Sequence, residues 1–170
     1  AGCGVLEVPV HRRPRVAVIA TGSELVPPSE VPGPGKIRNS NSFAMAACAQ
    51  RAGAVPHILP IVEDTFEALR DAVAAAARDY DFVVTTGGAA NGDFDFIKPV
   101  VAELGELKMT TVNMRPGKAQ TFGIVNGTPV FGLPGNPAAA YVGFEMLIRP
   151  ALRTMQGYTF MDHPTVRARL

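Results

Sequence analysis

Four short polar or glycine-rich segments could together form a ligand site, because each follows an apolar run that has the composition of a strand. They are Thr21-Gly-Ser-Glu24, Val62-Glu-Asp64, Thr86-Gly-Gly-Ala-Ala-Asn-Gly-Asp-Phe-Asp95 and Leu133-Pro-Gly-Asn-Pro137. In open α/β sheets, ligands bind outside the carboxyl ends of the strands. Four such segments at one sheet edge are more than a fold requires, so the sequence predicts a ligand site there.

Glycines and cations in and near these segments suit a bound oxyanion. Gly87, Gly88 and Gly92 permit close backbone approach, and successive exposed N–H groups in such a loop can hold phosphate. Arg115 and Lys118 flank a Pro-Gly turn, and they would offer an anion a planar fork and a point charge. Each feature also has a plainer interpretation. The glycines would only form a tight turn, and the two cations would be a solvated pair.

Carboxylates at separate strand ends predict a magnesium site. Asp93 and Asp95 follow the glycines, while Asp64 and Glu24 stand at the ends of other predicted strands. Such carboxylates can hold Mg²⁺ while it bridges ligand phosphates. Capping of the next helix is the alternative for Asp93 and Asp64, and it is compatible with ligand binding.

A helix start is predicted directly after the last apolar strand. Asn136 suits the N-cap, with Pro137 at the first helical position. A helix N-terminus attracts anions through its free N–H groups and its dipole. The alternative is simply a well-capped helix, but Pro134 and Gly135 at a predicted strand end favour a pocket.

The apolar runs and breakers predict an α/β fold, a three-layer α/β/α arrangement with a mostly parallel sheet. Strands are expected at 15–20, 55–62, 81–86, 107–114, 119–125 and 128–133, with a hairpin-like excursion around Pro116-Gly117 and a loop over 26–36. Helices are expected at 42–52 (capped by Ser40 or Asn41), 65–79, 94–104 and 137–155. Residues 1–14 are expected to be an arm, in which His11-Arg-Arg13 is a solvated linker, 15–157 the binding domain, and 158–170 a linker.

Composition narrows the class of protein. The 170 residues carry a net charge of +1 with 47% apolar and 18% charged residues, which argues against nucleic-acid and membrane partners. Two distant cysteines and three scattered histidines predict no disulfide scaffold and no histidine metal site, and they favour a cytoplasmic setting. Both ends are expected to be cut from a longer protein.

Five motifs stand in the order seen in molybdopterin molybdenumtransferases, a family that includes the C-terminal domain of gephyrin. They are Thr21-Gly-Ser-Glu-Leu25, Asn39-Ser-Asn41, Thr86-Gly-Gly88 with Gly92-Asp-x-Asp95, Arg115-Pro-Gly-Lys118 and Leu133-Pro-Gly-Asn-Pro137. The resemblance covers about residues 8–157 and implies a molybdopterin-binding domain. It also implies a reaction in which adenylylated molybdopterin and molybdate give molybdenum cofactor and AMP, assisted by Mg²⁺.

The resemblance assigns roles to particular residues. Asp95, Asp64 and Glu24 are implied to position Mg²⁺ and the pyrophosphate bond that is cleaved. The implied ligand-binding residues are Thr21, Gly22, Asn41, Gly87, Gly88, Gly92, Asp93, Arg115, Lys118, Pro134, Gly135, Asn136 and Pro137.

Several positions depart from the family pattern. The family usually has an acidic residue at Ser23, a serine in the glycine loop where Ala89-Ala90 stand, a proline at Ala119 and lysine at Arg115. These departures concern metal affinity and ligand geometry, not the fold.

The resemblance also implies parts beyond this chain. Full members add an N-terminal portion and a C-terminal β domain, act as homodimers and complete the site across domains. The isolated domain is therefore expected to bind ligand but turn over poorly. Possible partners are molybdopterin adenylyltransferase and molybdoenzyme maturation proteins.

Two other functions remain open from the sequence. A molybdopterin adenylyltransferase resembles Thr-Gly-Gly-Thr-Gly in the central loop, where this chain has Thr86-Gly-Gly-Ala-Ala-Asn91. A non-catalytic pterin-binding or scaffolding module would fit the departures at Ser23 and Ala89-Ala90. The choice of molybdenum or tungsten is also left open.

Overall fold

The computed structural model describes residues 1–87, 96–161 and 165–169. Six strands form one sheet in the order β4–β1–β5–β8–β7–β6. In that order they span Val55–Ile58, Arg15–Ala20, Phe82–Thr86, Thr128–Leu133, Thr121–Val125 and Gly105–Met109. The first four are parallel, whereas β7 runs antiparallel to β8 and β6 antiparallel to β7. The mostly parallel sheet expected from the sequence is confirmed.

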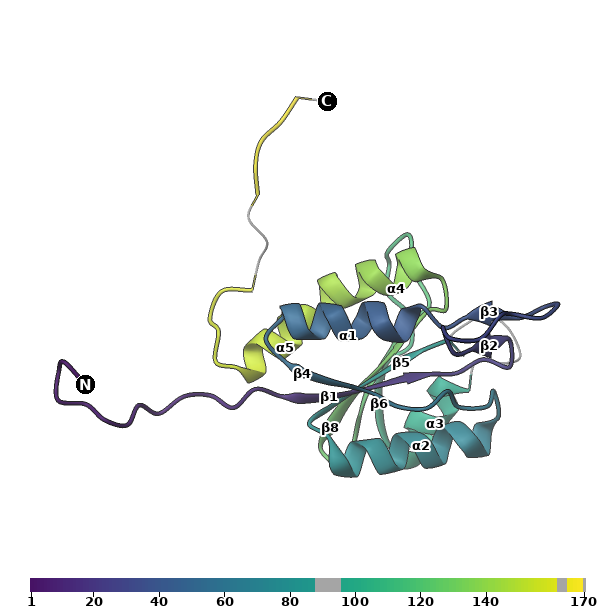
Figure 1. Ribbon diagram of the computed structural model, residues 1–170, viewed down its shortest axis with the longest axis horizontal. Coiled ribbons are helices and arrows are strands. Elements are labelled where there is room, and N and C mark those ends of the chain that lie inside the picture. The colour runs from purple at the N-terminus through teal and green to yellow at the C-terminus, as the bar shows by residue number, and fades with distance from the viewer. Residues whose placement is uncertain (88–95, 162–164, 170) are drawn as a thin grey trace.

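Helices cover both faces of this sheet, as Figure 1 shows. One layer contains α1 (Asn41–Arg51), α4 (Pro137–Gly143), η1 (Phe144–Ile148) and α5 (Arg149–Met155), and the other α2 (Phe66–Asp79) and α3 (Ile97–Leu104). Alternate residues of β1 face the two layers. Val16 and Val18 pack with the first, Ala17 and Ile19 with the second. Within the described residues, no helix has the length and apolarity needed to cross a membrane.

Three helix caps test the sequence predictions. The Asn136 carboxamide oxygen accepts hydrogen bonds from the N–H groups of Ala138 (3.0 Å) and Ala139 (3.2 Å), so that cap is confirmed. For α1 the predicted N-cap position of Ser40 is confirmed, but the capping bond comes from Asn39, whose side-chain oxygen accepts from the N–H of Ser42 at 3.2 Å. Ser40 occupies the N-cap position without a side-chain bond.

The helix α2 also has a different cap from the one considered. The Thr65 hydroxyl accepts from the Ala68 N–H at 3.3 Å, so Asp64 is not the capping side chain.

Two predicted strands are shorter than expected. The run 55–62 forms a strand only to Ile58, because Pro60 has no N–H with which to continue the ladder. The run 107–114 forms β6 over Gly105–Met109. The chain then leaves the sheet and returns through a loop closed by a bond from the Val112 N–H to the Lys118 carbonyl at 2.9 Å.

Other boundaries moved by smaller steps. The loop predicted at 26–36 lies between two short paired strands, β2 (Leu25–Val26) and β3 (Ile37–Arg38). The helix expected at 94–104 begins at Ile97, with residues 94 and 95 outside the described part.

The helix predicted over 137–155 is continuous but contains a π-helical segment, η1. The Arg149 N–H bonds to the Phe144 carbonyl, five residues earlier. Pro150 follows and has no N–H to donate to the carbonyl of Met146, so the regular pattern is interrupted there.

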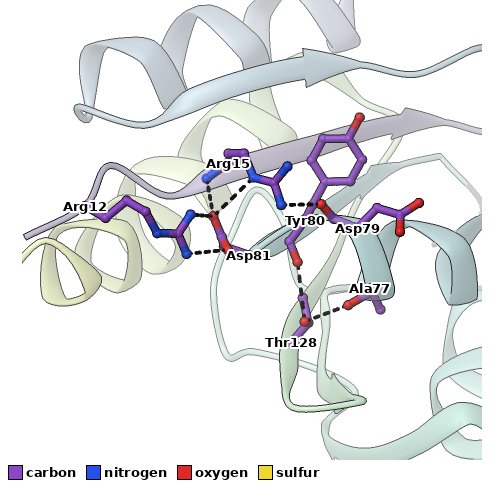
Figure 2. Close-up of polar contacts among 7 residues, drawn as sticks. All are labelled: Arg12, Arg15, Ala77, Asp79, Tyr80, Asp81 and Thr128. Atoms are coloured by element: carbon purple, nitrogen blue, oxygen red, sulfur yellow. Dashed lines mark hydrogen bonds and ion pairs between the residues drawn. The ribbon is translucent and has the colours of Figure 1, made fainter.

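The basic triplet of the arm is not merely solvated, which corrects the sequence interpretation. Figure 2 shows both terminal nitrogens of Arg12 donating to the Asp81 carboxylate, each at 2.7 Å. The same carboxylate accepts from the Arg15 N–H at 2.7 Å, and Arg13 donates to the Gly53 carbonyl at 2.6 Å. The hydrogen bond from Arg12 lowers the pKa of Asp81 against the opposing effect of burial. The Asp81 contacts hold the arm beside the start of β5, and the Arg13 contact holds it beside the start of β4.

Candidate functional site

The carboxyl ends of β1, β5 and β8 lie next to one another, as the predicted site requires. Ala20 is paired with Thr86, and Thr86 with Leu133. Beyond the strands, the Thr21 N–H donates to the Thr86 carbonyl at 3.0 Å and the Gly87 N–H to the Leu133 carbonyl at 3.3 Å. An isolated parallel bridge joins Thr21 to Val62. The starts of all four polar segments therefore meet at one edge of the sheet.

A cavity of about 80 Å³ lies at this edge. Its lining includes Thr21, Glu24, Asn41, Gly87, Gly135 and Pro137, which are all residues predicted from the sequence. The Asn41 amide nitrogen donates to the Gly135 carbonyl at 2.8 Å and so ties the start of α1 to the start of α4. Its amide oxygen is buried and accepts no hydrogen bond within the described part of the chain. Asn41 thus offers an unused acceptor at a cavity wall.

Gly87 is required by close packing at this edge. It has a φ of +88°, and a Cβ there would lie 2.1 Å from the Thr21 carbonyl oxygen. Side chains rarely adopt that φ, and backbone atoms cannot yield easily, so glycine holds the β1 and β5 ends together. A Cβ on Gly135, by contrast, would lie 3.7 Å from the Gly87 Cα, an ordinary contact.

The two described carboxylates of the predicted magnesium site lie on neighbouring segments. Glu24 folds back on its own turn, since a Cβ on Gly22 would lie 2.6 Å from the Glu24 Oε2 atom. The Thr21 hydroxyl lies 3.4 Å from Asp64 Oδ1 and equally far from the Glu63 carbonyl. Thr21 therefore links the cavity to the Asp64 loop.

The rest of the predicted metal site cannot be placed. Asp95, with Gly88, Gly92 and Asp93, lies outside the described residues. Among those that are described, no three acidic, histidine or cysteine side chains form a group able to hold a metal.

The Arg115–Lys118 turn lies against the first turns of α4. Gln120 is fully buried, and its amide nitrogen donates to the Gly117 carbonyl at 2.9 Å. A Cβ on Gly117 would lie 3.3 Å from the Ala139 carbonyl, and one on Gly143 would lie 2.6 Å from the Gln120 amide. The missing side chains at both glycines therefore let the turn and the helix approach each other.

The cations of this turn remain available. Arg115 and Lys118 are exposed, and neither forms an ion pair within the described ranges. Because the start of α4 also lines the cavity, the turn presents two positive charges beside the same helix end.

Sequence reasoning missed several residues that shape this region, among them two polar residues of the lining and one beneath the basic turn. Arg38 and Asn39 line the cavity, and Gln120 fixes the basic turn. Asn39 belongs to the motif Asn39-Ser-Asn41 and could have been included on that ground. Nothing in the sequence distinguishes Gln120 from an ordinary polar residue at the start of a strand.

Comparison with known proteins places this geometry in a family context. The family described as "Probable molybdopterin binding domain" matches residues 17–154. The chain is 44% identical over 152 residues to the molybdopterin molybdenumtransferase of Bacillus subtilis (strain 168), covering 89% of this chain and 35% of the relative. It is 41% identical over 155 residues to the protein of that name from Staphylococcus aureus (strain COL), with 91% and 37% covered.

The fold of the chain is also similar to that of a solved structure. The molybdopterin biosynthesis moea protein from Pyrococcus horikosii superposes with a TM-score of 0.79 at 36% identity, covering 86% of this chain and 36% of that one. The chain spans about a third of the length of the curated relatives it matches.

Proposed function

Since the chain belongs to the family of probable molybdopterin-binding domains, we propose that it is the pterin-binding part of a molybdopterin molybdenumtransferase. The substrates are adenylylated molybdopterin and molybdate, and the products are molybdenum cofactor and AMP. Relatives that carry this name at 44% and 41% identity support the transferase over the adenylyltransferase.

The observation that carries the proposal is the joining of α1 to α4 at the carboxyl edge of the sheet. The bond from Asn41 to the Gly135 carbonyl closes one wall of the cavity and leaves the Asn41 amide oxygen without a partner among the described residues. A pterin ring carries N–H donors that suit such an acceptor. The exposed Arg115 and Lys118 beside α4 suit the phosphate groups of the same ligand.

Two described residues fit a magnesium ion by their chemistry. Glu24 and Asp64 supply carboxylate oxygens, the ligands that Mg²⁺ prefers, from separate strand ends. We assign Asp95 as the third carboxylate on the basis of sequence alone. A bound Mg²⁺ would neutralise charge on the pyrophosphate group. The residues of the chain itself align the ligand. Thr21 contacts Asp64 and so positions its loop, and Gln120 bonds to Gly117 and so positions the basic turn.

The wider assignments rest on the family resemblance. They are an arm over 1–14, a binding domain over 15–157 and a linker over 158–170, within a longer cytoplasmic protein that forms a homodimer. Consistent with this division, the first strand begins at Arg15 and the last helix ends at Met155.

Calorimetric titration of the chain with adenylylated molybdopterin, with and without Mg²⁺, tests the proposal. We expect binding that Mg²⁺ strengthens and that Asn41→Ala weakens about tenfold, the cost of roughly one well-made hydrogen bond at a buried site. Gln50→Ala is the matched control, because Gln50 is exposed near the far end of the same helix.

Three outcomes would contradict parts of the proposal. Equal affinity of Asn41→Ala and the parent chain would remove Asn41 from the site. In the full-length enzyme, normal molybdate-dependent cofactor formation by Asp95→Asn would contradict the assigned carboxylates. Pterin binding by the full-length protein without any turnover would favour the scaffolding module.

A further inference from the structure

A second and larger cavity, of about 600 Å³, opens between α1 and the continuous helix formed by α4, η1 and α5. It shares no lining residue with the cavity at the carboxyl edge of the sheet. Gly53, which follows α1 and precedes β4, lies in its wall, so the cavity extends towards the amino ends of the strands. Nothing in the proposed transferase chemistry uses it.

Its walls are built from regularly spaced charged and aromatic residues. Tyr141, Glu145, Arg149 and Arg153 follow one another at intervals of four, so they line one face of the long helix. Arg51 reaches across from α1. Among the described lining residues, three guanidinium groups face one carboxylate, which leaves two positive charges in excess.

The carboxylate holds two of the arginines in place. Glu145 pairs with Arg51 and lies 3.4 Å from Arg149 Nε, and the Glu145 and Arg149 side chains are only 12% and 11% exposed. Arg149 also donates to the Met161 carbonyl at 2.6 Å. Burying such ions costs desolvation free energy that can offset their attraction, so the cluster is weak evidence of added stability.

The remaining arginine has no acidic partner among the described residues. Arg153 lies over the ring of Tyr158, with its guanidinium carbon 4.5 Å from the ring centre, and within the described segments it forms no ion pair. Stacking leaves the edge of the guanidinium plane, with its N–H donors, free to bind an anion. Arg51, whose side chain is 61% exposed, is the second accessible cation of the cavity.

We propose that this cavity is a binding site for a small-molecule dianion carrying phosphate or carboxylate groups, held by Arg51 and Arg153 over the Glu145–Arg149 pair. The excess of two positive charges sets the charge of the ligand. Arginine forks form paired hydrogen bonds to either group, so both chemistries share the same recognition. The site is separate from the pterin site and does not depend on the transferase assignment.

Titration of the 170-residue chain with inorganic phosphate and, separately, with succinate, both dianions at slightly alkaline pH, tests the site. NMR signals of the arginine side-chain N–H groups report where each anion binds. We expect at least one probe to shift the signals of Arg51 and Arg153, and to bind about tenfold more weakly to Arg51→Gln and to Arg153→Gln. The probe that binds more tightly identifies the ligand as a phosphate or a carboxylate.

Two control variants separate this site from the rest of the surface. Arg78→Gln removes an exposed arginine on the opposite helical layer, and Lys108→Gln removes an exposed lysine on the edge strand β6. Neither is expected to change the affinity. The proposal is overturned if neither probe shifts the Arg51 and Arg153 signals at millimolar concentration, or if the affinity read from the remaining arginine signal is unchanged in both Arg51→Gln and Arg153→Gln.

Discussion

Replacing Gly87 by alanine should destabilise the fold more than replacing a glycine that has a similarly positive φ but no atom near its Cβ position. The φ of +88° costs a side chain about 1–2 kcal/mol. A Cβ would also lie 2.1 Å from the Thr21 carbonyl oxygen, so reaching an ordinary contact of 3.4 Å needs a shift of roughly 1.3 Å between β1 and β5. Forced repacking of this kind costs about 1–3 kcal/mol more. The free energy of unfolding should therefore fall by about 2–5 kcal/mol.

Gly127→Ala is the matched control, measured by urea unfolding beside Gly87→Ala. Gly127 has a φ of +78°, but a Cβ there would meet nothing within 4 Å. The free energy of unfolding of Gly127→Ala should therefore fall only by the conformational cost of about 1–2 kcal/mol. An unchanged dependence of the unfolding free energy on urea would show that both variants unfold from a native-like state. Equal losses in the two variants would refute the reasoning, because the close approach of Gly87 to Thr21 would then cost nothing.

Three further substitutions test other contacts. Gln120→Met removes the amide nitrogen that donates to Gly117 and also the buried amide oxygen that has no partner among the described residues. Because the two effects offset each other, the free energy of unfolding should change by less than about 1 kcal/mol. The affinity for adenylylated molybdopterin should nevertheless fall several-fold in calorimetry, and an unchanged affinity would separate the turn from the site. Asn136→Ala removes the cap of α4 and should cost about 1 kcal/mol in thermal or urea unfolding, whereas no loss would mean that water replaces the cap. Asp81→Asn should lower the free energy of unfolding by about 1 kcal/mol at neutral pH. Since Arg12 lowers the pKa of Asp81 in the folded state, this contribution is complete above the unfolded pKa of about 3.9 and is lost as the pH falls through the folded pKa. A difference between the two proteins that did not shrink as the pH fell below about 3.9 would contradict this account.

Local sequence features were enough to predict most of the elements. The runs at 15–20 and 128–133 are apolar and broken by glycine or proline, and they form β1 and β8 at those positions. Asn136 before Pro137 caps its helix as predicted. These features depend on residues within a few positions of one another, so the chain specifies them before it folds. At the start of α1, Ser40 and Asn41 were the candidate caps, and the sequence did not indicate that the side chain of Asn39 makes the capping bond instead.

The sequence also determined which sheet edge carries the candidate site, because parallel strands bring their carboxyl ends together. Only the tertiary structure decided how the segments touch there. Asn41 bonds to Gly135 across 94 positions, and Gly87 is fixed by a carbonyl oxygen of another strand. The arginine cavity likewise depends on how α1 packs against the helix from α4 to α5. A residue type states what a side chain can bind, but its partner depends on packing between segments that are distant in the sequence.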